Sequence, residues 1–398
     1  MMKTNRWTLV LAGAGLISLP GVACAEEKPT ALLTGLSSTT LSGYVDTSAQ
    51  WNMGTGDQHT PAYSFGGTDK ADGFNLNVVN LALERPVDPK DEWGAGYKTE
   101  LLFGPDANSL ATQSSGTSTS DFCIKQAYVV LHAPVGNGLD FKIGVWDTII
   151  GYEVTDAPSN PNFTRSYGYS IEPTTHTGIQ AAYQVSEACG LVAGVANTFG
   201  PTINGRAFPP DAESYKAYMG AITLTAPESW GVLAGATLSG GVVNGFNSGA
   251  NANVGSGANQ TSWYVGGTMN TPLKALKLGA SYDYAGVSDQ SLSDASYANA
   301  TALYASYQVT EKMTFFVRGE YASSNALNSD GDPILGAEKV FAVTGTLQYD
   351  LWKNVLSRLE FRWDHAADGQ DAYGGTDPGD PPTKKNSFIL LANVAYKF

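Results

Sequence analysis

Two kinds of side chain alternate in the segment Val355-Leu356-Ser357-Arg358-Leu359-Glu360-Phe361-Arg362-Trp363-Asp364-His365, near the end of the chain. Val355, Leu359, Phe361 and Trp363 fall on one face of an extended chain, and Arg358, Glu360, Arg362 and Asp364 fall on the other. Successive side chains of a β-strand point to opposite faces, so this period of two predicts a strand between an apolar and an ionic environment. An Arg or Lys that faces lipid at the middle of a membrane costs about 2–4 kcal/mol, so the charged face requires water.

The same alternation recurs along the chain, for example in residues 139–146, 276–284 and 313–321. Residues 74–85 change phase near Val78, which predicts a β-bulge there. In total the pattern predicts about sixteen strands, near residues 39–51, 73–85, 93–103, 121–132, 138–147, 174–185, 188–199, 213–226, 230–243, 260–271, 275–287, 295–308, 312–323, 338–349, 354–365 and 386–398.

Short and long connectors alternate between these strands. Seven are short, and the other eight, at 52–72, 104–120, 148–173, 200–212, 244–259, 288–294, 324–337 and 366–385, are mostly longer. Bacterial outer-membrane barrels combine an even number of strands with short periplasmic turns and longer outer loops. The sequence therefore predicts an all-β fold, a transmembrane antiparallel up-and-down β-barrel of about 16 strands.

Composition excludes several other classes of protein. Only 15% of the 398 residues are charged and the net charge is −14, which makes the chain a poor partner for nucleic-acid phosphates. After residue 30 no run of about 18 apolar residues, the length of a membrane-spanning helix, is present. Residues 1–25 resemble a cleaved signal peptide, with Lys3 and Arg6 before an apolar stretch and small residues at the cleavage site. We expect a short periplasmic segment at 26–38 and the barrel at 39–398.

Aromatic residues are placed as a membrane barrel requires. All seven tryptophans after residue 25 fall at strand ends or in turns, where two boundary belts are expected: Trp51, Trp146, Trp263 and Trp363 on the long-loop side, and Trp93, Trp230 and Trp352 on the short-turn side. The last strand alternates from Phe388 to Phe398 and ends on that Phe, which resembles the assembly signal of outer-membrane proteins. The membrane allows no open sheet edge, so this strand is expected to pair with the first.

Several short motifs also resemble a known family. They are Leu41-Ser42-Gly43-Tyr44-Val45-Asp46, Asp72-Gly73-Phe74-Asn75-Leu76-Asn77, Asp121-Phe122-Cys123-Ile124-Lys125-Gln126-Ala127-Tyr128 and Lys142-Ile143-Gly144-Val145-Trp146-Asp147 with the following Gly151-Tyr152-Glu153. The chain is similar in these motifs to the OmpL-like β-barrel porins, most clearly over residues 40–185. The resemblance implies an outer-membrane pore for small solutes and no defined substrate.

Motifs for catalysis, cofactors or metals are not found. The chain has four His and none of the common hydrolase, metalloprotease or nucleotide-binding motifs, so we expect no catalytic residues, no cofactor and no metal site, and the chain is not expected to be an enzyme. The acidic stretches 328–332 and 371–380 match no EF-hand and are expected to be solvated loops. In this topology Cys123 and Cys189 lie at opposite rims, too far apart for a disulfide, so both are expected to be free thiols.

Charged residues on the strand faces opposite the apolar ones, together with charges of the third long connector, are the candidate pore residues. They are Lys98, Glu100, Lys125, Lys142, Glu153, Asp156, Arg165, Arg318, Glu320, Arg358, Glu360, Arg362 and Asp364. In general porins the third long loop folds into the barrel, so the resemblance implies that Glu153 and Asp156 face Arg318, Arg358 and Arg362 across the lumen. The alternative is that these charges only pair with one another and keep the lumen hydrated.

These observations predict a porin of the cell outer membrane that passes small polar solutes or ions by diffusion, because barrels of 16–18 strands leave an aqueous channel. A surface adhesin, a structural barrel without transport and, less well supported, a barrel enzyme remain alternatives. The expected partners are outer-membrane lipid and lipopolysaccharide, the barrel-assembly machinery through the strand that ends in Phe398, and other copies of the chain, since general porins are often homotrimers.

Overall fold

The structure is a computed structural model, and it describes residues 38–398 except 55, 57, 67–69, 71, 89, 111, 113–119, 208–213, 249–258, 288–294, 328–332 and 378. The predicted signal peptide, nearly all of the predicted periplasmic segment and the acidic stretch 328–332 lie outside the described residues. Among the described residues, no helix is both long enough and apolar enough to cross a membrane.

Sixteen strands form the described chain, joined by turns and loops with a few short helices. The strands are β1 (Thr40–Asn52), β2 (Gly73–Arg85), β3 (Gly94–Phe103), β4 (Phe122–Ala133), β5 (Leu139–Asp147), β6 (Thr175–Ser186), β7 (Cys189–Ala196), β8 (Ala217–Thr225), β9 (Thr237–Phe246), β10 (Asn259–Asn270), β11 (Leu276–Val287), β12 (Ser296–Thr310), β13 (Met313–Ser324), β14 (Lys339–Trp352), β15 (Val355–Ala366) and β16 (Asn386–Lys397). The helical turns are α2 (Asp106–Ser109), η2 (Ala157–Ser159), α3 (Tyr167–Ile171) and η4 (Glu228–Leu233).

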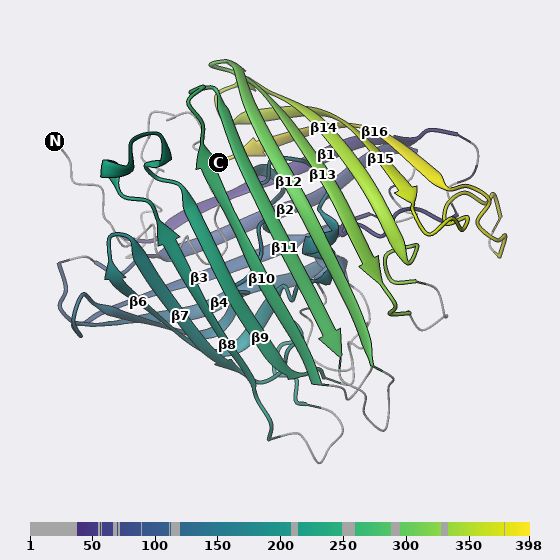
Figure 1. The fold of residues 1–398 in the computed structure, drawn as a ribbon. Coiled ribbons are helices and arrows are strands. Elements are labelled where there is room, and N and C mark those ends of the chain that lie inside the picture. Colours follow the sequence, from purple (N-terminus) through teal and green to yellow (C-terminus); the bar gives the residue numbers. More distant parts are fainter. Residues whose placement is uncertain are drawn as a thin grey trace.

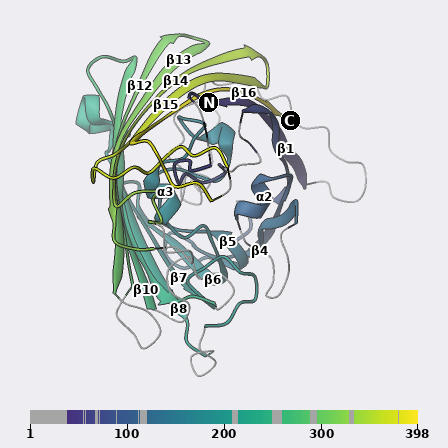
Figure 2. The ribbon, with the colours of Figure 1, turned by 90° about the vertical axis from the view of Figure 1, so that its right-hand side faces the viewer.

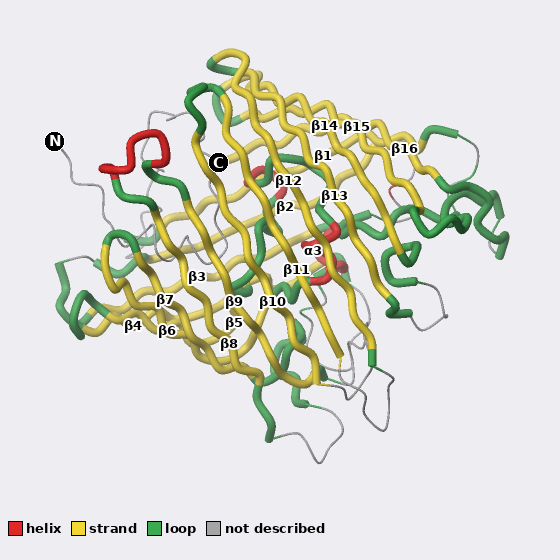
Figure 3. The backbone as a smooth tube through the Cα atoms, viewed as in Figure 1, coloured by secondary structure: helices red, strands yellow, loops and turns green. Residues whose placement is uncertain are grey.

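These strands close into one barrel, as Figure 1 shows. Each strand pairs antiparallel with the next along the chain, and β16 pairs with β1 to complete the ring. Figure 3 shows how the strands dominate the backbone, with the helical turns confined to connectors. At the closure Phe398 donates its backbone N–H to Gly43 and accepts one from it, at 3.0 and 3.1 Å. The predicted 16-stranded antiparallel barrel is confirmed.

The two faces of the wall differ as the alternation predicts. On β15, Leu359 and Phe361 lie outside with 53% and 43% of their surface exposed, whereas Arg362 and Asp364 point inward and are fully buried. A sheet with one lipid-facing and one inner face separates side chains in this way because the period of a strand is two. The exposed outer face is apolar, and the ionic groups lie inside the barrel.

Two elements differ from the sequence-based prediction. The strand predicted at 230–243 begins only at Thr237, because Glu228–Leu233 forms the helical turn η4, in which Gly231 adopts a φ of 62°. The strands predicted at 188–199 and 213–226 are likewise shorter, so the connector between β7 and β8 is longer than expected. Trp230 still lies at the short-turn end and is strongly exposed.

Trp146 is the one clear exception to the predicted tryptophan belts. Trp51, Trp93, Trp230, Trp263 and Trp352 are exposed on the outside, as predicted. Trp146 is fully buried, because it shares the inward face of β5 with Asp140 and Lys142. Like the other tryptophans, Trp146 lies near a strand end. The alternation of side chains along β5 nevertheless places its indole on the inner face of the barrel.

Two smaller predictions are confirmed in the described residues. The β1–β2 register shifts so that Asp46 faces Val78 and Thr47 faces Leu76, which makes Asn77 the extra residue of a bulge. Cys123 and Cys189 are both free thiols. The interior is not an open cylinder, because buried side chains of the connector after β5, such as Tyr167 and Ile171, pack against alanines of the wall.

Candidate functional site

The connector between β5 and β6, residues 148–174, enters the barrel and is called the inner loop below. Figure 2 shows its helix α3 within the ring of strands. A hydrogen bond from Thr148 N–H to the Thr174 carbonyl, at 2.8 Å, closes the base of the inner loop. Ser166 begins α3 by accepting the N–H of Tyr169 at 3.1 Å, which is the usual role of a serine at a helix N-cap. Residues 148–173 therefore lie in the lumen, as the resemblance implied.

Three arginines on the inner face of β13 and β15, Arg318, Arg358 and Arg362, hold the inner loop and are called the arginine wall. Arg318 donates to the Glu153 carboxylate at 2.8 Å and to the Thr164 carbonyl at 2.7 Å. Arg358 donates to the carbonyls of Ala157 and Asn160 at 2.9 and 2.5 Å. Arg362 donates to the Arg165 carbonyl at 2.7 Å. A guanidinium has five donors in a fixed plane, which suits it to collect several carbonyls at once.

Carboxylates that lie two residues beyond each arginine on the same strand also bind the inner loop. Glu320 accepts the backbone N–H of Tyr167 at 2.7 Å, and Glu360 accepts those of Phe163 and Thr164 at 2.6 and 2.9 Å. Asp364 accepts the Tyr167 hydroxyl at 2.8 Å and forms an ion pair with Arg362 at 2.9 Å. Arg318, Glu320, Arg362 and Asp364 have side-chain exposures of 0–1%. The arginine wall is thus sealed from lumen water by the inner loop.

The tip of the inner loop also contacts the inner face of β1 and β4. There the Asp156 carboxylate accepts from Lys125 of β4 at 2.9 Å and from the Tyr44 hydroxyl of β1 at 3.1 Å. Lys125 also forms ion pairs with Glu100 at 2.9 Å and with Asp147 at 3.4 Å. Since Lys125 is itself 1% exposed, it acts as a buried centre that joins β3, β5 and the inner loop.

Charged groups that still contact water lie on this second side. Lys98 on β3, Lys125 on β4 and Lys142 on β5 are called the lysine wall. The side chains of Lys98, Asp147 and Asp156 are 23%, 33% and 27% exposed. Lys142 is half-buried and lies over the Tyr128 ring, 4.8 Å from its centroid. Lys98, Asp147 and Asp156 thus form a group of partly exposed charges between the tip of the inner loop and the lysine wall.

Arg165 stabilises the inner loop itself. Its guanidinium donates to the carbonyls of Phe163 and Thr155 at 2.6 Å each and to that of Val154 at 3.0 Å. It also lies over the rings of Phe65 and Tyr169, 5.2 and 5.7 Å from their centroids. Arg165 is 2% exposed, so its contacts are with the loop and not with the lumen.

At the base of the inner loop two carboxyl groups lie together. Glu172 forms a hydrogen bond with Asp283 of β11, and burial together with the neighbouring Asp283 and Glu153 raises the pKa of Glu172 well above its ordinary value. Two neighbouring carboxyl groups cannot both ionise without a large electrostatic cost, so we expect the pair to share a proton. Gly151 makes room for this pair, because a Cβ there would meet the Glu172 carboxylate.

The structure brings together some predicted residues and separates others. Glu153 does meet Arg318, but Asp156 pairs with Lys125 and not with Arg358 or Arg362, which bind loop carbonyls instead. Sequence reasoning missed Tyr44, Asp46 and Asp147. The alternation of β1 places Tyr44 and Asp46 on the inner face, so that pattern could have found them; Asp147 follows the strand's inner residue Trp146 and carried no such signal.

The histidines do not form a catalytic arrangement among the described residues. His132 pairs with Asp140 at 2.6 Å, His176 with the Thr148 hydroxyl at 3.2 Å and His365 with Asn386 at 2.9 Å. His59 contacts the Asp380 carbonyl at 2.7 Å. Within the described ranges no group of three or more His, Cys, Asp or Glu side chains is arranged to hold a metal ion.

Comparison with known proteins agrees with this architecture. Residues 38–398 match the model of the family described as "Putative beta-barrel porin-2, OmpL-like". No curated protein sequence matches the chain.

Several solved structures share this fold. An anion-selective porin from Comamonas acidovorans superposes with a TM-score of 0.59 at 14% identity, covering 91% of this chain and 99% of that one. Salmonella typhi OmpF in complex with daunomycin gives 0.58 at 12% identity, with 90% and 97% covered. The outer membrane channel DcaP of Acinetobacter baumannii gives 0.55 at 16% identity, again with 90% and 97% covered. At these identities the likeness concerns the fold.

Proposed function

The chain belongs to the family of Putative beta-barrel porin-2, OmpL-like proteins and is a passive diffusion channel of the outer membrane, and from this premise we propose the route that solutes take through it. Ions and small polar solutes pass between the tip of the inner loop and the lysine wall. The arginine wall acts as the anchor of the inner loop and does not line the route.

One asymmetry supports this route. Under the inner loop on β13 and β15, the side chains of Arg318, Glu320, Arg362 and Asp364 are 0–1% exposed. Lys98, Asp147 and Asp156 keep 23–33% of their side-chain surface exposed. Water and ions follow the accessible polar surface, because an ion that left it would lose its hydration. The solute path therefore lies where the charges are wet.

Selectivity in this route comes from width and from facing charges. Lys98 and Lys142 belong to the barrel wall, and Asp156 belongs to the inner loop opposite them, so a solute crosses a field that runs from the wall to the loop. Such a field favours small polar and zwitterionic solutes that can align with it and slows apolar ones. Transport by this route uses no cofactor, because the solute moves down its own concentration gradient.

The test is the ion preference of lysine-wall variants in planar bilayers under a salt gradient. Lys142→Gln and Lys98→Gln remove positive charge from the proposed route, so the reversal potential is expected to move toward cation preference. Lys312→Gln removes the same charge from an exposed turn between β12 and β13 and serves as the control. If the lysine-wall variants and the control give the same reversal potential as the parent, the proposed route is wrong.

Assembly and partners form a further part of the proposal. We infer that the assembly machinery recognises β16 through Phe398, whose backbone completes the β1–β16 closure. A Phe398→Ala variant should then yield less folded, heat-modifiable barrel in outer membranes, and an unchanged yield would remove that role.

A homotrimer in lipopolysaccharide-containing membrane is proposed by analogy with Vibrio cholerae OmpT, which is described in a trimer form. Cross-linking in intact cells tests the trimer directly.

A further inference from the structure

The connector between β8 and β9 differs from the other connectors at the short-turn end of the barrel. Residues 226–236 make it the longest of them, ahead of 86–93, and they contain the helical turn η4. No residue of η4 is buried. In Figure 2, η4 is the helical turn drawn outside the ring of strands, near β12, and Figure 3 shows it in red at the rim of the barrel. The connector therefore bends away from the lumen, toward the outer side of the wall.

Three apolar side chains of η4 project into the surroundings. Trp230, Val232 and Leu233 are 61%, 50% and 38% exposed. Residues 226–236 include one charged residue, Glu228, whereas the connector 86–93 at the same end carries four charged residues. Apolar side chains are stabilised when they leave water for an apolar medium. A cluster of three at the outer rim of a membrane barrel therefore indicates that something less polar than water covers η4.

The backbone of the connector holds this cluster in a fixed position. Trp230 donates its backbone N–H to the Pro227 carbonyl at 3.0 Å. Gly231 has a φ of 62°, in the left-handed region that glycine adopts without steric cost, and it turns the chain within η4. The side chain of Asn270 on β10 donates to the Ala234 carbonyl at 2.9 Å, which ties the connector to the wall.

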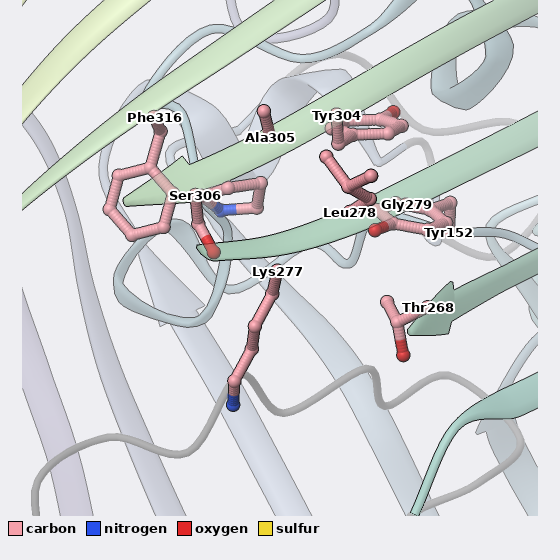
Figure 4. A pocket seen from close by; sticks show the side chains of 10 residues that line it. Tyr152, Thr268, Lys277, Leu278, Gly279, Tyr304, Ala305, Ser306 and Phe316 are labelled. Carbon is pink, nitrogen blue, oxygen red and sulfur yellow. The ribbon is translucent and has the colours of Figure 1, made fainter. Parts of the chain in front are cut away.

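The wall beside η4 has an apolar outer face and a polar inner face. On the outer face, Leu224 of β8 and Leu238 of β9 are 42% and 52% exposed, and they lead directly into the connector. On the inner face of the neighbouring strands lie Thr268, Lys277 and Ser306, which Figure 4 shows near the inner loop. Because η4 bends to the outer side, its apolar side chains continue the lipid-facing surface of the barrel and not the lining of the lumen.

Trp230 suits the boundary between lipid and water. An indole combines a large apolar ring with one N–H donor, and it prefers the headgroup level of a membrane. The Trp230 indole N–H has no hydrogen-bond partner among the described residues. It is therefore available to donate to an ester or phosphate oxygen of a phospholipid, while the side chains of Val232 and Leu233 contact the acyl chains.

We propose that η4 is a lipid-binding surface, which inserts Trp230, Val232 and Leu233 among the phospholipids of the leaflet at the short-turn end. Interfacial apolar groups of this kind reach about 5–10 Å into the boundary between headgroups and acyl chains. The occupant is lipid because η4 continues an outer wall that already lies in lipid. The inference goes beyond the proposed solute route and depends on neither the lysine wall nor the inner loop.

The test measures the depth of η4 in phospholipid liposomes by electron paramagnetic resonance. A nitroxide label is attached to Val232→Cys or to Leu233→Cys, each in a background with Cys123→Ser and Cys189→Ser. Power saturation compares the access of oxygen, which concentrates in lipid, with the access of a nickel chelate, which stays in water. Asp91→Cys is the matched control, because Asp91 is exposed in the charged connector 86–93 at the same end of the barrel.

Labels at positions 232 and 233 are expected about 5–10 Å below the lipid phosphates, with strong access to oxygen and weak access to the nickel chelate. The label at position 91 is expected on the water side. Heat-modifiable migration on gels confirms that each labelled barrel is folded before it is measured.

Two results would overturn the proposal. Equal access of the nickel chelate to positions 91, 232 and 233 would place η4 in water. Labels at 232 and 233 that neither oxygen nor the nickel chelate reaches would place a protein, such as a second copy of the chain, on η4. Neither result concerns conduction, so a failure of the solute route and a failure of this inference are distinguishable.

Discussion

At the scale of single residues, the arginines of β13 and β15 have a role that their position alone does not reveal. A guanidinium on the inner face of a porin strand is usually considered as part of the ion path. Here Arg318 and Arg362 are fully buried, and their donors are used by loop carbonyls and by carboxylates of the same strand. Neighbouring carboxylates neutralise their positive charge, so the two arginines fix the position of the inner loop more than they contribute to the electric field in the lumen.

Arg362→Gln should therefore behave as the loss of an anchor. Removing one partner of a buried ion pair leaves Asp364 uncompensated, which typically costs about 3–5 kcal/mol. We expect a lower midpoint of chemical unfolding and a larger, noisier single-channel conductance as the inner loop moves from the wall. Arg206→Gln, in an exposed part of the β7–β8 connector, is the control. Parent-like stability and conductance together with altered ion preference would contradict the anchor role.

Glu172 gives the chain a stability term that depends on pH. Burial and the nearby Asp283 raise its pKa in the folded chain, so the folded protein holds a proton that the unfolded chain releases. The stabilisation by this proton is complete below the unfolded value of about 4.3 and is lost as pH rises through the raised folded value. Glu172→Gln cannot ionise and keeps a neutral donor for Asp283.

The Glu172→Gln variant should thus gain stability relative to the parent as pH rises. The measurement is the free energy of unfolding of both proteins at about pH 4 and about pH 8, on either side of the ordinary carboxyl range. Glu311→Gln, in the exposed turn after β12, should show no such change with pH. A difference between Glu172→Gln and the parent that is the same at both pH values would argue against a shared proton.

At the scale of elements, all sixteen strands were predicted, from clear alternation in several segments and from the turn-rich stretches that separate the others, because lipid and lumen select opposite side chains at each step of the chain. The bulge at Asn77 was also visible as a change of phase. The segment 230–236 was misassigned because its apolar residues resemble a strand, while Pro227 and the positive φ of Gly231 turn the chain at η4. Trp146 was predicted in the outer belt only because it lies close to a strand end. Whether its position along β5 is odd or even decides which face of the sheet the indole is on, and this position places it inside.

The conformation of the inner loop could not be predicted from the residues alone. Arg358 and Arg362 bind backbone carbonyls of residues 157, 160 and 165, and a carbonyl belongs to every residue type. The sequence therefore identifies the arginines but not their acceptors. Two contacts of the inner loop, Glu153–Arg318 and Asp156–Lys125, join side chains that charge complementarity could have matched.

Gly151 tests how tightly the base of the inner loop is built. Its φ is 121°, which side chains of L-residues rarely adopt, and a Cβ would meet Glu172. Gly151→Ala should lower stability by roughly 1–3 kcal/mol for the backbone strain and more for the contact. Gly369 also has a positive φ, 86°, but has open space around it, so Gly369→Ala isolates the backbone effect. Equal unfolding midpoints for the two variants would show that the Glu172 contact is not tight.

At the scale of the whole molecule, the barrel is a wall with an internal partition. The inner loop is fixed to β13 and β15 and contacts β1 and β4 with its tip. The closed ring of strands supplies the rigid frame, and the partition divides its interior into a sealed side and a wet side. Family membership establishes a porin, and the solute route that we propose follows from this division of the interior.

Accessibility of single cysteines in the conducting channel measures this division directly. In a background with Cys123→Ser and Cys189→Ser, Lys142→Cys places a thiol on the wet side, and Thr344→Cys places one on β14, beneath the inner loop, where Thr344 is fully buried. A cationic methanethiosulfonate reagent should react rapidly at position 142 and change the single-channel current, and it should leave position 344 unmodified. Equal reaction rates at the two positions would contradict a sealed arginine side and a solute path along the lysine wall.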